Sequence, residues 1–252
     1  MFSEIKKISS LLLSVAFSSI GFIASITVTV LAAREVSSNP LFVGFPNAVG
    51  VGGAVLGTRM IYLISKTNSQ LNALAFTFLI GAFGGAIMFY SLIIDSFLLL
   101  LLGAFVLGIG QSATLQTRYA ASFVAGTKFK ATALSLAVWF SVFGSVFGPR
   151  MVGSYSNFFE NIFNSELIVG YVIAFVGMLF ATASLFTFTS IKSILRSPSD
   201  LENESYDQSS ERKNGNLLSL LLVLNHFTMV VIMSATPLHI QDIGETVQLV
   251  GI

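Results

Sequence analysis

The stretch that decides the fold is residues 141–154, which read SVFGSVFGPRMVGS. It lies inside a long apolar run, yet it contains three glycines, a proline and an arginine. Gly144 and Gly148 are four residues apart, so on a helix they share one face, where a neighbouring backbone can approach closely. Pro149 removes one backbone donor, and a membrane helix tolerates this when neighbouring groups satisfy the freed carbonyl. The stretch therefore predicts a closely packed transmembrane helix that bends at a fixed place.

The composition of the whole chain indicates a membrane protein. Hydrophobic residues make up 54% and charged residues 10% of the 252 residues, and the mean hydropathy is +0.83, whereas soluble domains are about a quarter charged. Apolar windows of roughly 20 residues, long enough to cross a bilayer, recur along the chain. Because backbone amides in lipid must be satisfied within their own segment, these windows predict helices. The expected fold is an all-α polytopic bundle with spans at 11–33, 41–64, 72–93, 97–118, 131–153, 167–191 and 217–238.

The same composition argues against several other classes of protein. The net charge is +1 and basic residues are scattered between the spans, which gives no indication of nucleic-acid binding. The chain has no cysteine, hence no thiolate metal site or thiol nucleophile. His226 and His239 are too far apart along one helix to form a zinc site. Since no hydrolase elbow, zinc-protease motif or phosphate loop occurs, we expect no enzyme activity, no cofactor and no metal.

Basic residues between the spans predict the orientation in the membrane. Lys and Arg are retained on the cytoplasmic side, and a cytoplasmic N-terminus leaves only Arg34 and Arg150 in the outer loops. That orientation places these basic residues inside: Lys6, Lys7, Arg59, Lys66, Lys128, Lys130, Lys192, Arg196, Arg212 and Lys213. The first apolar run is longer than that of a signal peptide, so we expect a retained span. Without a transit peptide, a prokaryotic plasma membrane is the favoured location.

A polar segment divides the chain after the sixth expected span. Residues 192–216 are almost without apolar side chains and read as a cytoplasmic linker. We therefore expect an N-terminal six-helix bundle over 1–191. Residues 217–252 would then form the first span of a second bundle and the start of the next. Membrane transporters with six spans, an inner linker and further spans pair two six-span halves. We therefore expect the chain to be a truncated fragment of a protein with about five more spans.

The opening stretch resembles the fifth-helix motif of the major facilitator superfamily, a family of membrane transporters. Gly144, Gly148, Pro149 and Gly153 match that motif, and Val152 replaces the first glycine of its final pair. In that family the motif is associated with antiporters. The resemblance therefore implies an efflux direction of transport.

Two further regions match the family only in part. Gly108 and Gly110 are similar to its glycine-rich fourth helix, but Ala104 stands where the family has an arginine linked to proton coupling. After Gly57 the family has an Asp-Arg pair with a basic tail, whereas residues 57–69 read GTRMIYLISKTNS. These departures put proton coupling by the family's usual route in doubt.

The resemblance covers nearly the whole chain and implies a function. It implies a secondary transporter that moves a small molecule by rocking two six-span halves around a central site, with the lipid bilayer, an unidentified solute and a coupling ion such as H⁺ as partners. Fold alone does not fix function. A non-transporting scaffold or receptor on the same fold, or an inactive fragment, therefore remains an alternative.

Polar residues within the expected spans are candidates for a solute or proton path. Gln111 and Arg118 are seven residues apart, so they lie on the same helix face and predict a polar stripe that faces the bundle. Arg118 lies near the inner end of its span, where its long side chain can reach the headgroups as an anchor. The alternative is a role in an inner gate or in the solute path, since charges within spans are costly and often functional.

Three other polar residues have two interpretations each. Asn225 and His226 lie in the first half of the seventh expected span, where the histidine can carry a proton or simply bond to a neighbouring helix. Asn47 follows Pro46, which predicts a bend with a solute-facing amide. Its simpler alternative is an interhelical hydrogen bond.

Overall fold

The computed structural model of the protein describes residues 2–37, 42–163 and 165–187, together with 224, 228 and 232. Over the three continuous ranges the chain forms long helices joined by short turns, and no strand occurs there. All six of these helices are long and apolar enough to cross a membrane. They are α1 (Phe2–Val36), α2 (Phe45–Thr67), α3 (Gln70–Ile93), α4 (Phe97–Val124), α5 (Gly126–Phe163) and α6 (Ile168–Thr187).

Each of the first six expected spans coincides with one of these helices, which confirms the helical bundle. The ends differ most at α5, where the expected span 131–153 lies within a helix of 38 residues. The helix extends into polar stretches at both ends, which a search for apolar windows does not include. The linker 192–216 and the seventh span 217–238, apart from residues 224, 228 and 232, lie outside the described residues.

Local sequence signals explain the turns between neighbouring helices. Ser69 caps α3, its Oγ accepting a hydrogen bond from the backbone N of Asn72 at 3.3 Å, and Ser96 caps α4 in the same way with Leu99 at 3.4 Å. Gly126 has φ +72°, a left-handed conformation that suits glycine, at the turn from α4 to α5. Short turns of this kind force successive helices to run antiparallel.

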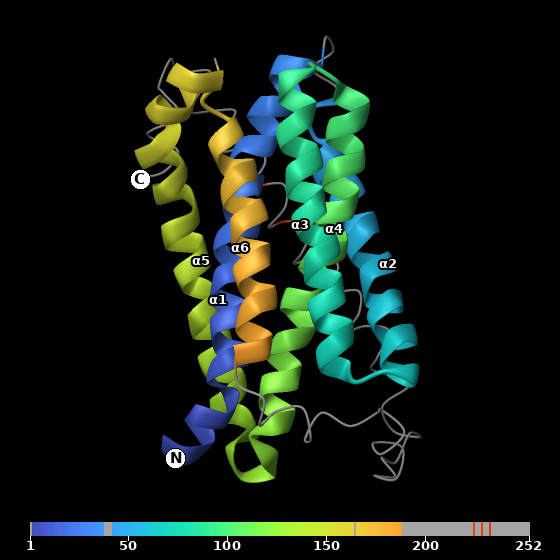
Figure 1. Ribbon diagram of the computed structural model, residues 1–252, viewed down its shortest axis with the longest axis vertical. Helices are drawn as coiled ribbons and strands as arrows, with labels where there is room; N and C mark the ends of the chain where they lie inside the picture. Colours follow the sequence, from blue (N-terminus) through green and yellow to red (C-terminus); the bar gives the residue numbers. More distant parts are fainter. Residues whose placement is uncertain are drawn as a thin grey trace.

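The six helices form two similar units, one of α1 with α5 and α6 and the other of α4 with α2 and α3, and corresponding helices of the two units run in opposite directions (Figure 1). In the first unit α1 runs upward from the N-terminus, and in the second unit α4 runs downward. The main contacts of α1 are with α5 and α6, and those of α4 are with α2 and α3. Contacts between α1 and α4 and between α3 and α6 join the units. This arrangement is an inverted structural repeat, as found within transporter halves.

Burial differs strongly between the helices. In the most apolar stretch of α1, 67% of the residues are buried, against 22% in α2 and in α5. Helix α1 is therefore the centre of the bundle, and α2 and α5 lie at its edges. The described part of α5 exposes a row of large apolar side chains, which are Val138, Trp139, Val142, Phe143, Val146, Phe147, Tyr155, Phe158 and Ile162.

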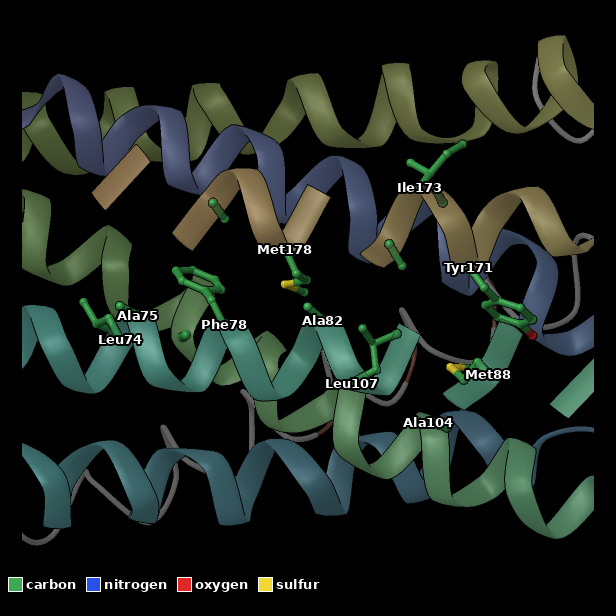
Figure 2. Close-up of a cluster of buried hydrophobic side chains, with 14 of the residues drawn as sticks. Leu74, Ala75, Phe78, Ala82, Met88, Ala104, Leu107, Tyr171, Ile173 and Met178 are labelled. Carbon is green, nitrogen blue, oxygen red and sulfur yellow. The ribbon is translucent and has the colours of Figure 1, made fainter. Parts of the chain in front are cut away.

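A core of buried side chains joins α3, α4 and α6 (Figure 2). Phe78 of α3 and Met178 of α6 are fully buried, and Leu107 of α4 is 3% exposed. Tyr171 is also fully buried, and its hydroxyl donates a hydrogen bond to Oγ1 of Thr29 in α1 at 3.5 Å. Apolar packing on one side and this polar contact on the other hold α6 between α1 and α3.

Candidate site at the glycine contacts and the polar stripe of α4

The two glycines of the opening stretch lie directly against the backbone of α1. A Cβ atom built on Gly144 would be 2.5 Å from Cβ and 2.6 Å from the carbonyl carbon of Ser19. One built on Gly148 would be 3.0 Å from the backbone N of Ala24 and from the carbonyl oxygen of Ile20. Both glycines are buried. The close approach of α5 to α1 therefore depends on the absence of side chains at these two positions.

Helix α2 packs on α4 in the same way. A Cβ on Gly53 would collide with the backbone of Phe105, whose carbonyl carbon would be 2.9 Å away. A Cβ on Gly57 would be 2.6 Å from the carbonyl oxygen of Ile109. The edge helices α2 and α5 thus dock onto the inner helices α4 and α1 through equivalent pairs of glycines, in keeping with the inverted repeat.

The glycines expected in the fourth span also lie at helix contacts. Gly108 meets the backbone of Gly50 in α2, and Gly110 meets the Cα of Gly81 in α3. Gly108 and Gly110 are two residues apart and point to different sides of α4. Through them α4 touches both of its main neighbours at the level of its middle.

Pro149 and Gly153 lie in the C-terminal half of α5. The helix continues through Pro149 to Phe163, so the proline does not end it. Both residues are half-buried. Their neighbour Val152 is fully buried, so the residue that replaces the family's glycine takes part in the packing of the bundle.

Polar side chains follow one face of α4 toward its C-terminal end. Gln111 and Arg118 are half-buried, and Thr114 between them is 1% exposed. The Oε1 of Gln111, the Oγ1 of Thr114 and the Nε of Arg118 are each buried without a hydrogen-bond partner. The two residues predicted from their spacing thus share a stripe. The prediction omitted Thr114, although its position three residues after Gln111 and four before Arg118 places it on the same face.

The bend expected at Pro46 is absent. Helix α2 begins at Phe45, so Pro46 lies in its first turn, where a proline starts a helix without disturbing it. Asn47 is half-buried at this N-terminal end of α2. Asn225 and His226 lie outside the described residues. Their roles, in a proton path or in a hydrogen bond to a neighbouring helix, therefore stay predictions.

Acidic side chains gather at the end of the bundle where the turns after α1, α3 and α5 lie, and they are Glu35, Asp95, Glu160 and Glu166. Burial raises the pKa of Glu166 above its ordinary value, and the charge of Glu160 raises this pKa further. Neither these acids nor any other group of three His, Cys, Asp or Glu residues in the described ranges is arranged to hold a metal ion.

The chain is similar to two curated proteins along almost its whole length. The uncharacterized MFS-type transporter YdeG of Bacillus subtilis (strain 168) is 28% identical over 250 residues, which are 95% of this chain and 58% of YdeG. The MFS-type transporter YddS of the same organism is 26% identical over 258 residues, which are 98% of this chain and 59% of YddS. The chain thus spans less than two thirds of the length of either relative.

No family model and no solved structure matches the chain. The two relatives carry the names of transporters and not of enzymes, which agrees with the expectation from the sequence. Together with the six long apolar helices, they indicate an integral, multi-pass membrane protein. The family resemblance drawn from the glycine and proline motif is confirmed.

Proposed function

We propose that this chain of the major facilitator superfamily takes part in carrying a small solute across a membrane by alternating access. The observation that carries the proposal is the equivalent docking of α2 on α4 and of α5 on α1. At both contacts glycine lets one backbone lie on another, so few interlocked side chains oppose a small sliding movement. Movements of this kind are what exposes a central site to one side of a membrane and then to the other.

A second six-helix half is part of the proposal. The exposed apolar rows of α2 and α5 lie on the two edges of the bundle, where such a half would cover them. In α2 the row consists of Val51, Val55, Leu56, Tyr62 and Leu63. Residues 217–252 would begin that half, after the cytoplasmic linker 192–216.

Export is the proposed direction of transport. The proposal is supported by Gly144, Gly148, Pro149 and Gly153, because the matching family motif is associated with antiporters. A proton is the coupling ion that we propose, although Ala104 replaces the arginine of the usual route. His226 is the candidate carrier, since histidine titrates near neutral pH.

Substitution of Gly148 separates a transporter from a static scaffold. A leucine there meets the backbone of α1 at Ala24 and Ile20 and should hold α5 away from it. We expect Gly148→Leu to reduce solute flux at least tenfold while the amount of protein in the membrane stays within about twofold of wild type. Gly148→Ala, whose Cβ needs a shift of only a few tenths of an ångström, should retain most of the flux.

The control is Ser145→Leu, which adds the same side chain to the same helix at an exposed position. If Gly148→Leu and Ser145→Leu transport alike at equal abundance, the sliding contact has no role in transport. If neither variant nor the wild type shows any flux, the scaffold alternative replaces the proposal.

A further inference from the structure

We propose that Gln111, Thr114 and Arg118 form a binding site for an oxyanion, a carboxylate or phosphate group, within the membrane-spanning part of α4. That the oxyanion belongs to the transported solute rests on the proposed function. Binding itself does not rest on it. The site is built from side chains that lack partners among the described residues although they are wholly or partly buried.

The three residues continue a buried seam of α4. Ala104 and Leu107 are 6% and 3% exposed, and Gln111, Thr114 and Arg118 follow them at alternate steps of four and three residues. This spacing keeps all five on one helix face. The stripe is therefore covered by the bundle, in contrast to the neighbouring Tyr119, which is 66% exposed.

The depth of the stripe follows from the contact between α4 and α3. Gly110 meets Gly81, which is near the middle of α3 (Gln70–Ile93), so Gln111 lies near the middle of the span. Arg118 is seven residues further on, about 10 Å nearer the inner end. Side chains on a helix lean toward its N-terminus, which for α4 is the outer end. The Cα–Cβ bond of Arg118 therefore points toward the turn of α4 that contains Thr114.

The hydroxyl of Thr114 is uncommitted, which distinguishes it from its neighbours. In α4 the hydroxyls of Ser112, Thr117 and Ser122 each donate to the carbonyl three or four residues earlier, at 2.7 Å. Threonines in helices commonly do so. The Oγ1 of Thr114 makes no such bond although it is buried. Leaving a buried hydroxyl unpaired is costly, so a ligand that accepts a hydrogen bond from this hydroxyl is favoured.

Arg118 supplies the positive charge that selects an anion. No salt bridge to Arg118 occurs among the side chains of residues 8–37, 42–163 and 165–187, and its Nε is buried without a partner. A guanidinium presents several donors in a plane that matches carboxylate and phosphate oxygens. The amide of Gln111 adds a donor and an acceptor, and the acceptor suits a hydroxyl on the same ligand. A hydroxycarboxylate or a phosphate ester fits this set of groups.

The test is the thermal unfolding of the purified full chain in a neutral detergent, with sodium lactate or inorganic phosphate as the added probe. We expect a saturable rise of the unfolding midpoint that sodium chloride at equal ionic strength does not produce. Arg118→Gln and Thr114→Val should each weaken the apparent affinity at least tenfold. Arg150→Gln, which changes an exposed arginine of α5, should leave the affinity unchanged. Arg118→Lys keeps the positive charge and should therefore retain part of the affinity that Arg118→Gln loses.

Mixed micelles containing phosphatidylglycerol distinguish a solute from a lipid headgroup. If this lipid alone raises the midpoint through Arg118, the oxyanion is a headgroup and its assignment to the solute is overturned. If neither probe nor lipid acts, or if Arg118→Gln responds like the wild type, the site itself is overturned. Should lactate or phosphate bind while no solute flux is found in vesicles, the binding site stands and only the proposed function fails.

Discussion

Gly81 of α3 and Gly110 of α4 lie back to back across the contact between their helices. A Cβ atom built on Gly81 would be 2.7 Å from the Cα of Gly110, and one built on Gly110 would be 2.6 Å from the Cα of Gly81. Side-chain carbons do not approach a backbone so closely. A side chain at either position would collide with the backbone at the other position. Helices α3 and α4 therefore contact each other through their backbones.

Replacing either glycine of this pair by alanine should destabilise the bundle. The added methyl group has to push two backbones apart in a closely packed region, which typically costs about 1–3 kcal/mol. We expect Gly81→Ala and Gly110→Ala to lower the unfolding midpoint in detergent by similar amounts. The double variant should lose less than twice the stability that either single variant loses, because the first substitution already separates the helices. Additive effects would show that the two positions act independently.

The neighbouring glycines of α2 provide a sharper comparison. A Cβ on Gly53 collides with the backbone of Phe105, whereas one on Gly52 has only the ring of the same residue within reach, at 4.0 Å. Gly53→Ala should therefore lower the stability by about 1–3 kcal/mol. Gly52→Ala should leave it unchanged or raise it by up to about 1 kcal/mol, because alanine favours a helix. Equal effects of the two substitutions in thermal unfolding would contradict the packing of α2 on α4.

The pKa of Glu166 makes stability depend on pH. It is raised above the ordinary value of 4.5, first by burial and then by Glu160. A carboxyl group with a raised pKa stabilises the fold when it is protonated, and this contribution is lost as the pH rises from about 4.5 through the raised value. We expect Glu166→Gln to have a higher unfolding midpoint than the wild type at pH 8, and the difference to vanish near pH 4. Parallel pH profiles of the two proteins would contradict this account.

The orientation in the membrane can be measured directly, because the chain contains no cysteine. A single cysteine placed at Ser96, between α3 and α4, should react with an impermeant maleimide added to intact cells. One placed at Asn68, between α2 and α3, should react only after the membrane is opened. The reverse pattern would place the N-terminus outside.

The sequence was sufficient to predict the helices but not the way they pair. Long apolar runs settle the number of spans in the described part, because lipid leaves no alternative to a helix. The inverted repeat was not predicted, because no sequence motif is repeated. It depends on which small residues contact the backbone of a neighbouring helix, as Gly53 does at Phe105. Pro46 was misread as a bend because its place in the first turn depends on where α2 begins.

The candidate site was predictable to a similar degree. Gln111 and Arg118 stand out because polar side chains are rare within spans, and their spacing places them together. Thr114 does not stand out, because most hydroxyls of these helices bond to their own backbone. Only the structure distinguishes the buried hydroxyls that have no such bond, and that of Thr114 is one of them.

Solute flux is the measurement that tests the central claim most directly. Inside-out membrane vesicles containing the protein, produced from its own gene, are given a proton gradient and a panel of labelled organic anions, cations and neutral solutes. The account predicts that at least one solute accumulates in a way that requires both the protein and the gradient, and that an uncoupler abolishes the accumulation. If no solute accumulates above the level in vesicles without the protein under any imposed ion gradient, the chain is not part of a transporter of this kind.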